Sequence, residues 1–215
     1  MSTTPAPASR LTTRLGAAAV AAGGVLFAGY QILRPYADET KFEGLQAMAS
    51  NAWIAAHLYA CATFLLLPFA FYALRPLVGH TRLASAAVVT AWLGAGLTIV
   101  YYGAEIFGVH AMAVRGVETN DVTMLDSVEA FRYHPAAMTI FAAGLLLLGV
   151  SGVLAAIAIA RSGSFAKWTG WPLAIGLALL LPQFFTPPAG RMAHGVLLAI
   201  GAIAVGAAMW RSKKS

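Results

Sequence analysis

The chain has 215 residues, of which 60% are hydrophobic and only 10% are charged, whereas an ordinary soluble domain carries about 25% charged residues. This composition excludes a soluble globular protein and predicts a multi-pass protein of the cell membrane, with the lipid bilayer as its surroundings. The net charge of +6 is spread over short basic clusters between apolar runs, so we assign it to membrane topology and expect no nucleic-acid partner.

The N-terminal fourteen residues are polar, basic and contain two prolines, which predicts a disordered cytoplasmic tail over residues 1–14. The apolar run 15–33 that follows has nearly the ~20 residues needed to span a bilayer and exceeds the core of a signal peptide. We therefore predict a retained first transmembrane helix. Signal cleavage after Ala37 is the alternative, and it would leave five spans.

Further apolar runs follow at 53–74, 83–114, 135–160, 168–185 and 192–210. Trp53 opens the second run and suits a membrane-interface anchor, while Pro135 stands at a favourable first helical position. The connections alternate between basic and acidic, so the positive-inside rule places both termini in the cytoplasm. The sequence thus predicts an all-α integral membrane protein with six transmembrane helices, both termini cytoplasmic, in one domain of residues 15–210 before a basic cytoplasmic tail, 211–215.

Two local features refine this prediction. The segment 121–132 is charged, and we expect chiefly a solvated connection there, with a short helix over the outer mouth of the bundle as the alternative. The sixth run carries a stripe of small residues, which in membranes allows helices to approach closely. Its members are Gly195, Ala199, Ala202 and Gly206.

Glu105 is the residue that points most directly to function, because an ionisable side chain at membrane depth is costly and marks a functional site by default. Thr98, Tyr101, Tyr102 and Glu105 follow one another at spacings that place them on one face of a helix. The sequence therefore predicts a polar, aromatic stripe that points into the bundle.

Histidines and an arginine on other runs lie at a similar depth. At about 1.5 Å of rise per residue from the cytoplasmic end of each run, His57 and His194 share one depth, and Arg191 and Glu105 lie about a turn further out. We therefore predict an outer-leaflet pocket built by Glu105, His57, Arg191 and His194.

The favoured interpretation of this pocket is haem or transition-metal binding in membrane redox chemistry. His57 and His194 could ligate the iron of a b-type haem, with Arg191 meeting a propionate. Alternatively, His57, His194 and Glu105 form a two-histidine, one-carboxylate metal site.

Three other interpretations remain open, and the sequence does not decide whether the protein is an enzyme. The first is a lipid or isoprenoid enzyme, such as a terpene cyclase, in which Glu105 is the general acid and Tyr101 and Tyr102 stabilise a carbocation. The second is a non-catalytic accessory or assembly subunit with a structural ion pair between Glu105 and Arg191. The third is a small transporter. A quinone, an isoprenoid or a partner subunit are the partners considered.

Overall fold

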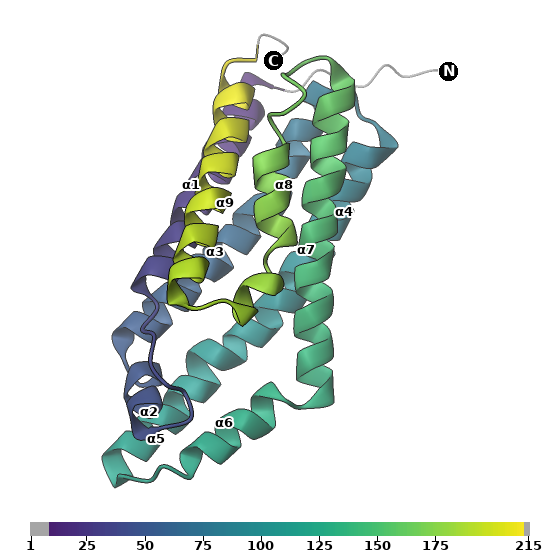
Figure 1. Ribbon diagram of the computed structural model, residues 1–215. Helices are drawn as coiled ribbons and strands as arrows, with labels where there is room; N and C mark the ends of the chain where they lie inside the picture. The colour runs from purple at the N-terminus through teal and green to yellow at the C-terminus, as the bar shows by residue number, and fades with distance from the viewer. Residues whose placement is uncertain (1–8, 213–215) are drawn as a thin grey trace.

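The computed structural model describes residues 9–212, and this part of the chain is helical, with connecting turns and no strands (Figure 1). Five helical segments are long and apolar enough to cross a membrane, so the protein is a multi-pass helical membrane protein. These segments are Arg10–Leu33, Asn51–Val78, Arg82–Thr119, Pro135–Ser162 and Pro188–Trp210.

The long helices pack as one bundle. α1 (Arg10–Leu33) lies between α3 (Asn51–Leu74) and α9 (Pro188–Trp210), while α4 (Arg82–Gly103) packs against α3 and α7 (Pro135–Ser162). The predicted small-residue stripe of α9 is confirmed as a close contact, since a Cβ built on Gly24 of α1 would lie 2.5 Å from the Cβ of Ala202. Close approach of this kind replaces hydrophobic driving force as the source of helix association in a bilayer.

The first helix begins earlier than the sequence predicts. The side chain of Ser9 accepts a hydrogen bond from the backbone N–H of Thr12 at 3.1 Å, and α1 starts at Arg10. A serine N-cap satisfies one of the free N–H groups of the first turn. The predicted disorder of the tail falls mainly on residues 1–8, which lie outside the described residues, as do residues 213–215.

The predicted fifth span is not one continuous helix. Residues 168–185 form the eight-residue helix α8 (Trp171–Ala178), a turn, and the short 3-10 helix η3 (Pro182–Phe185). Pro182 has no backbone N–H and its ring hinders continuation of a helix, which accounts for the break. α8 still packs between α7 and α9, and α1 starts at the end of the bundle where α9 finishes (Figure 1). The count of six spans and the cytoplasmic termini stay predictions.

Three shorter helices cover the opposite end of the bundle. α2 (Phe42–Met48), α5 (His110–Thr119) and α6 (Met124–Arg132) form what we call the cap (Figure 1). The short-helix alternative for residues 121–132 is therefore what the structure shows. The cap has its own buried core, made of Leu45, Met48, Trp53, Val109, Ala113, Leu125 and Val128. Trp53 is fully buried there, so its predicted role as an interface anchor is wrong.

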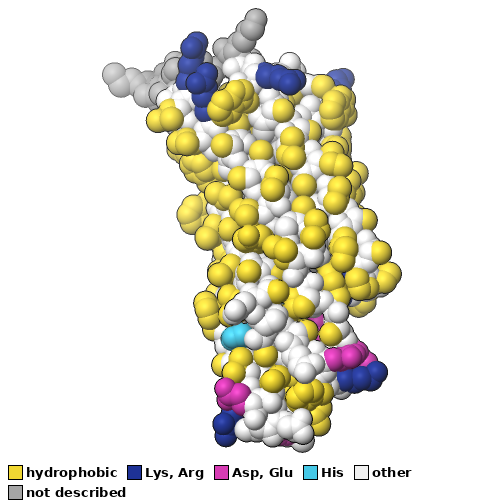
Figure 2. All heavy atoms as spheres, turned by 90° about the vertical axis from the view of Figure 1, so that its left-hand side faces the viewer, with side chains coloured by type: hydrophobic (Ala, Val, Ile, Leu, Met, Phe, Trp, Pro, Cys, Tyr) yellow, Lys and Arg dark blue, Asp and Glu magenta, His cyan; other side chains and the backbone are white. Residues whose placement is uncertain are grey.

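The surface agrees with a bilayer around the bundle. Figure 2 shows a band of hydrophobic side chains between two charged ends, with Lys and Arg at the end near the chain termini and acidic residues together with Lys or Arg at the cap end. Exposed apolar residues on the long helices include Leu65, Trp92, Val100 and Ile200. Such a surface would be unfavourable in water and suits contact with lipid.

Candidate functional site

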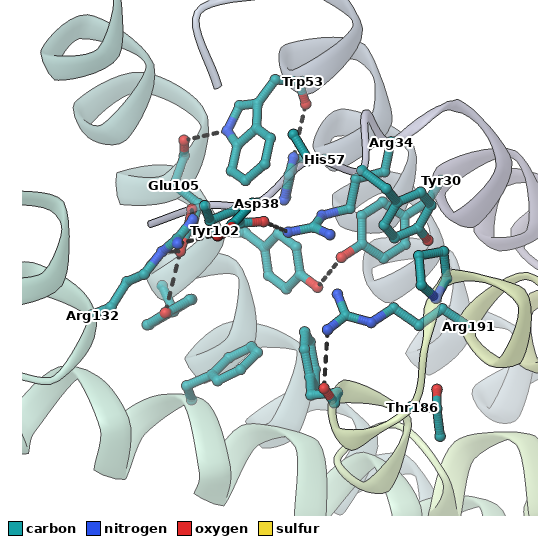
Figure 3. Close-up of a pocket in the computed structure, with 17 residues that line it drawn as sticks. Tyr30, Arg34, Asp38, Trp53, His57, Tyr102, Glu105, Arg132, Thr186 and Arg191 are labelled. Carbon is teal, nitrogen blue, oxygen red and sulfur yellow. Dashed lines mark hydrogen bonds and ion pairs between the residues drawn. The ribbon is translucent and has the colours of Figure 1, made fainter. Parts of the chain in front are cut away.

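A cavity of about 570 Å³ lies where the bundle meets the cap (Figure 3). Its volume is in the range of pockets that bind small molecules. Aromatic and charged side chains dominate its wall. The charged residues are Arg34, Asp38, Glu39, Glu105, Arg132 and Arg191.

Glu105 is buried, and its carboxylate is bound by Arg132 of the cap helix α6. The Nε of Arg132 donates to Oε1 of Glu105 at 2.7 Å and its Nη2 donates to Oε2 at 2.9 Å. This two-pronged arrangement is the strongest geometry for an arginine and a carboxylate. The hydroxyl of Tyr101 also donates to Oε1, at 3.2 Å.

The predicted ion pair between Glu105 and Arg191 is therefore wrong. Arg191 instead donates from Nη2 to the backbone carbonyl of Phe184 at 2.9 Å. The physical reason is that α6 folds back over the mouth of the bundle. This fold places Arg132 beside Glu105, which lies 27 positions earlier in the chain. The depth of a residue within an apolar run does not predict how the connection between two runs folds.

The ion pair of Glu105 extends into a chain of alternating charges. Nη1 of Arg132 donates to Oε2 of Glu39 at 2.5 Å, and Oε1 of Glu39 accepts from Nη2 of Arg34 at 2.6 Å. Burial would raise the pKa of Glu39, but the two guanidinium groups outweigh burial and hold this pKa below its ordinary value. Burial would lower the pKa of Arg132, but Glu105 and Glu39 outweigh it and raise this pKa. Glu39 and Arg132 therefore stay charged at neutral pH.

Local backbone geometry helps to place Glu105. α4 passes into α5 through a π-helix, η2 (Ala104–Val109), which holds Glu105. The wider π-turn is rare, occurs often at functional sites, and alters the pairing of nearby carbonyl groups. Here the carbonyl of Glu105 accepts a hydrogen bond from the indole Nε1 of Trp53 at 3.0 Å. This bond ties α3 to the π-helix and explains why Trp53 is buried.

The three cavity arginines are arrayed across two aromatic rings. The guanidinium carbons of Arg191 and Arg34 lie 5.9 and 5.3 Å from the ring centre of Tyr36. Those of Arg34 and Arg132 lie 5.0 and 5.7 Å from the ring centre of Trp53. Cation–π contacts of this length are attractive, and the shared rings hold the three cations in one region.

These cations outnumber the carboxylates that neutralise them. Within residues 9–212, Arg191 has no carboxylate oxygen within 4.0 Å, and the Nε of Arg34 is buried without a hydrogen-bond partner. Asp38 also lines the cavity, but it is paired with Lys41 at 2.9 Å. The wall therefore carries three arginines and three carboxylates, of which Arg191 is the arginine without a carboxylate partner among the described residues.

The two predicted histidine ligands, His57 and His194, do not face the same cavity. His57 lines the cavity, and its Nδ1 lies 2.8 Å from the carbonyl of Trp53. His194 lies outside the cavity, and its Nε2 lies 2.7 Å from the carbonyl of Gly176. The rings of Phe27 and Tyr30 link the two imidazoles through successive contacts of 5.4, 5.6 and 5.4 Å.

The predicted metal set is consequently not assembled. Among the described residues, no group of three or more His, Cys, Asp or Glu side chains is placed to hold a metal ion. Both oxygens of Glu105 are bound by Arg132. His194 Nε2 lies at a carbonyl, and its unpaired Nδ1 is buried in a residue that does not line the cavity. The haem arrangement with His57 and His194 as axial ligands stays a prediction, and of the two histidines only His57 lines the cavity.

The remaining predicted residues do surround the cavity. Tyr102 donates to the hydroxyl of Tyr30 at 3.1 Å, and the ring of Tyr101 stacks on Phe141 at 4.1 Å between ring centres. The structure thus brings together Tyr101, Tyr102, Glu105, His57 and Arg191, whose chemical roles remain proposals. Sequence reasoning missed Arg34, Tyr36, Glu39 and Arg132 as site residues. The available signal was the presence of arginines within connections that are otherwise acidic.

Comparison of the chain with protein-family models, with curated proteins and with solved structures finds no match. The function is therefore argued from the geometry of the cavity.

Proposed function

We propose that this membrane protein binds an amphiphilic organic anion in the cavity between the bundle and the cap. The observation that carries the proposal is the lack of a carboxylate partner for Arg191 on the cavity wall. Arg191 has no carboxylate partner within residues 9–212, and the buried Nε of Arg34 has no acceptor there. Placing a guanidinium group in a confined site without a counter-charge is costly, and a bound anion would remove that cost.

Arg34 and Arg191 are suited to hold one anionic group together. Both contact the ring of Tyr36, and Figure 3 shows Arg191 and Arg34 entering the same space from different elements. Arg132 enters from the opposite side and is already committed to Glu105 and Glu39. The anion would therefore lie near Arg191 and Arg34, in a position to accept bidentate hydrogen bonds from a planar guanidinium fork.

The rest of the cavity suits an apolar group. Phe141 stacks on Tyr101 and contacts Phe184 at 5.4 Å between ring centres, which makes an aromatic wall on the α7 side. A water molecule occupies roughly 30 Å³ of liquid, so a cavity of about 570 Å³ is much larger than a small inorganic ion requires. An organic chain or ring lying against this wall would account for the volume.

This proposal gives Glu105 a different role from that of a general acid. Both of its oxygens accept hydrogen bonds from Arg132, so proton donation would first require this pair to separate. In the proposed function, Glu105 holds Arg132 and the cap helix α6 over the cavity. Arg191 and Arg34 are then the residues that contact the ligand.

The test is a titration of the protein in mild detergent with hexyl phosphate, hexanoate and hexylammonium, followed by thermal unfolding. The two anions should raise the unfolding midpoint because they bind the folded state, and the cation should not. Arg191→Gln should weaken anion binding at least about tenfold, as expected for a lost charged hydrogen bond. Arg115→Gln is the matched control, because Arg115 lies exposed on α5 and does not line the cavity. Equal effects of anion and cation, or full binding by Arg191→Gln, would overturn the proposal.

A further inference from the structure

We infer that the anionic group is a phosphate monoester and that His57 is a further binding residue that shares a proton with it. This inference rests on the proposed function and specifies its ligand. It starts from the hydrogen bond of 2.8 Å between His57 Nδ1 and the carbonyl of Trp53. A carbonyl oxygen can only accept, so Nδ1 carries a proton and the neutral ring presents a lone pair at Nε2.

Nε2 of His57 is available to a ligand. It makes no hydrogen bond within residues 9–212. It is also not one of the fully buried, unpaired polar atoms in that part of the chain, and His57 lines the cavity. The ring is held firmly, because its centre lies 4.3 Å from the ring of Trp53 and 5.4 Å from that of Tyr30. Figure 3 shows His57 directed into the space that Arg34 also enters. The cavity therefore offers one fixed acceptor next to its cationic donors.

The groups around this acceptor are mainly donors. Arg191 provides N–H groups, and the hydroxyl of Tyr30 already accepts from Tyr102, which leaves its own proton to donate. An ionised carboxylate or sulfate could accept from all of these donors but would bring no proton for Nε2 of His57. Such a ligand would leave that nitrogen without a partner, which is costly in a confined site.

A phosphate monoester satisfies both kinds of group. Its second pKa is about 6, so near neutral pH it readily carries or releases one proton. A protonated oxygen can donate to Nε2 of His57 while the other oxygens accept from Arg191 and Arg34. If the proton moves to Nε2, the imidazolium donates to the doubly charged phosphate, so the pair holds one proton in either form. No covalent bond changes in this step.

The decisive comparison is hexyl phosphate against hexyl sulfate, which is tetrahedral and anionic but has no exchangeable proton at neutral pH. Wild-type protein should bind the phosphate at least about tenfold more tightly, the scale of one hydrogen bond to a charged group. His57→Phe keeps a ring beside Trp53 and should lose most of this preference while its affinity for hexyl sulfate is retained. That retained affinity shows that the cavity is still folded. His57→Gln returns an acceptor to the position and should recover part of the preference.

The outcomes separate this inference from the proposed function. If hexyl phosphate and hexyl sulfate bind but His57→Phe keeps the full preference, the inference is wrong and the anion site stands. If neither anion binds wild-type protein, the proposed function itself fails. Two further probes assign the source of the phosphate monoester. Binding of phosphatidate in phosphatidylcholine vesicles without binding of glycerol phosphate indicates a membrane lipid, and the reverse indicates a water-soluble ester.

Discussion

Replacement of Arg132 by Met tests whether the charge chain joins the cap to the bundle. The substitution keeps an apolar stem of similar length but removes the donors to Glu105 and Glu39. Glu105 would then remain buried with 7% of its side chain exposed and with only Tyr101 as a side-chain partner. Breaking one side of a buried ion pair costs 3–5 kcal/mol. We expect about 3 kcal/mol, at the low end of that range, because Arg132 is 19% exposed and Glu39 keeps Arg34.

The assay is the free energy of unfolding in a mixed-detergent titration, followed by circular dichroism. Arg115→Met, on the exposed face of α5, should change this free energy by less than about 0.5 kcal/mol. Adding Glu105→Gln to Arg132→Met should restore part of the loss, because the buried carboxylate is then no longer an unpaired charge. A loss below about 1 kcal/mol in Arg132→Met, or strictly additive losses in the double variant, would refute the coupling derived from the structure.

Two further predictions concern stability. Because the folded-state pKa of Glu39 lies below its ordinary value of about 4.3, its contribution is present above that value and is lost as pH falls through the folded-state value. The unfolding midpoint should therefore drop more between pH 6 and pH 3 in wild-type protein than in Glu39→Gln, and parallel pH profiles would contradict this. Gly201→Ala should destabilise by about 1–3 kcal/mol, because the new Cβ would lie 2.3 Å from a backbone nitrogen of α8. Gly96→Ala, whose Cβ would meet nothing within 4 Å, should leave the midpoint unchanged or slightly higher, and equal losses in the two variants would contradict the packing of α8 on α9.

Composition and hydrophobic runs were sufficient to predict a multi-pass helical protein, because length and apolarity directly determine which segments can cross a bilayer. The fifth run shows the limit of this reasoning. Residues 168–185 are apolar enough for a span, yet Pro182 prevents one continuous helix, and the eight-residue α8 and the short η3 form instead. Hydropathy measures the preference of a segment for lipid, whereas its backbone hydrogen bonding depends on single residues.

Helical periodicity correctly grouped Tyr101, Tyr102 and Glu105 around one cavity, since residues three and four apart lie on the same face. The prediction that Arg191 is the partner of Glu105 was wrong for a different reason. Its identity depends on how residues 120–132 fold back over the bundle, and no periodicity within the spans describes that path. Trp53 was misplaced for the same reason, because the cap core that buries it is built from the connections.

The connections at the cap end contain arginines as well as carboxylates. Under the topology proposed from the sequence, the cap lies on the outer side, where the positive-inside rule disfavours arginine. Arg34 and Arg132 are nevertheless found there, and together with Arg191 they line the cavity. Glu39 and Glu105 account for two of these three charges through their ion pairs with Arg34 and Arg132. Structural pairing therefore explains Arg34 and Arg132, whereas Arg191 has no carboxylate partner in residues 9–212, and the proposed anionic ligand would supply one.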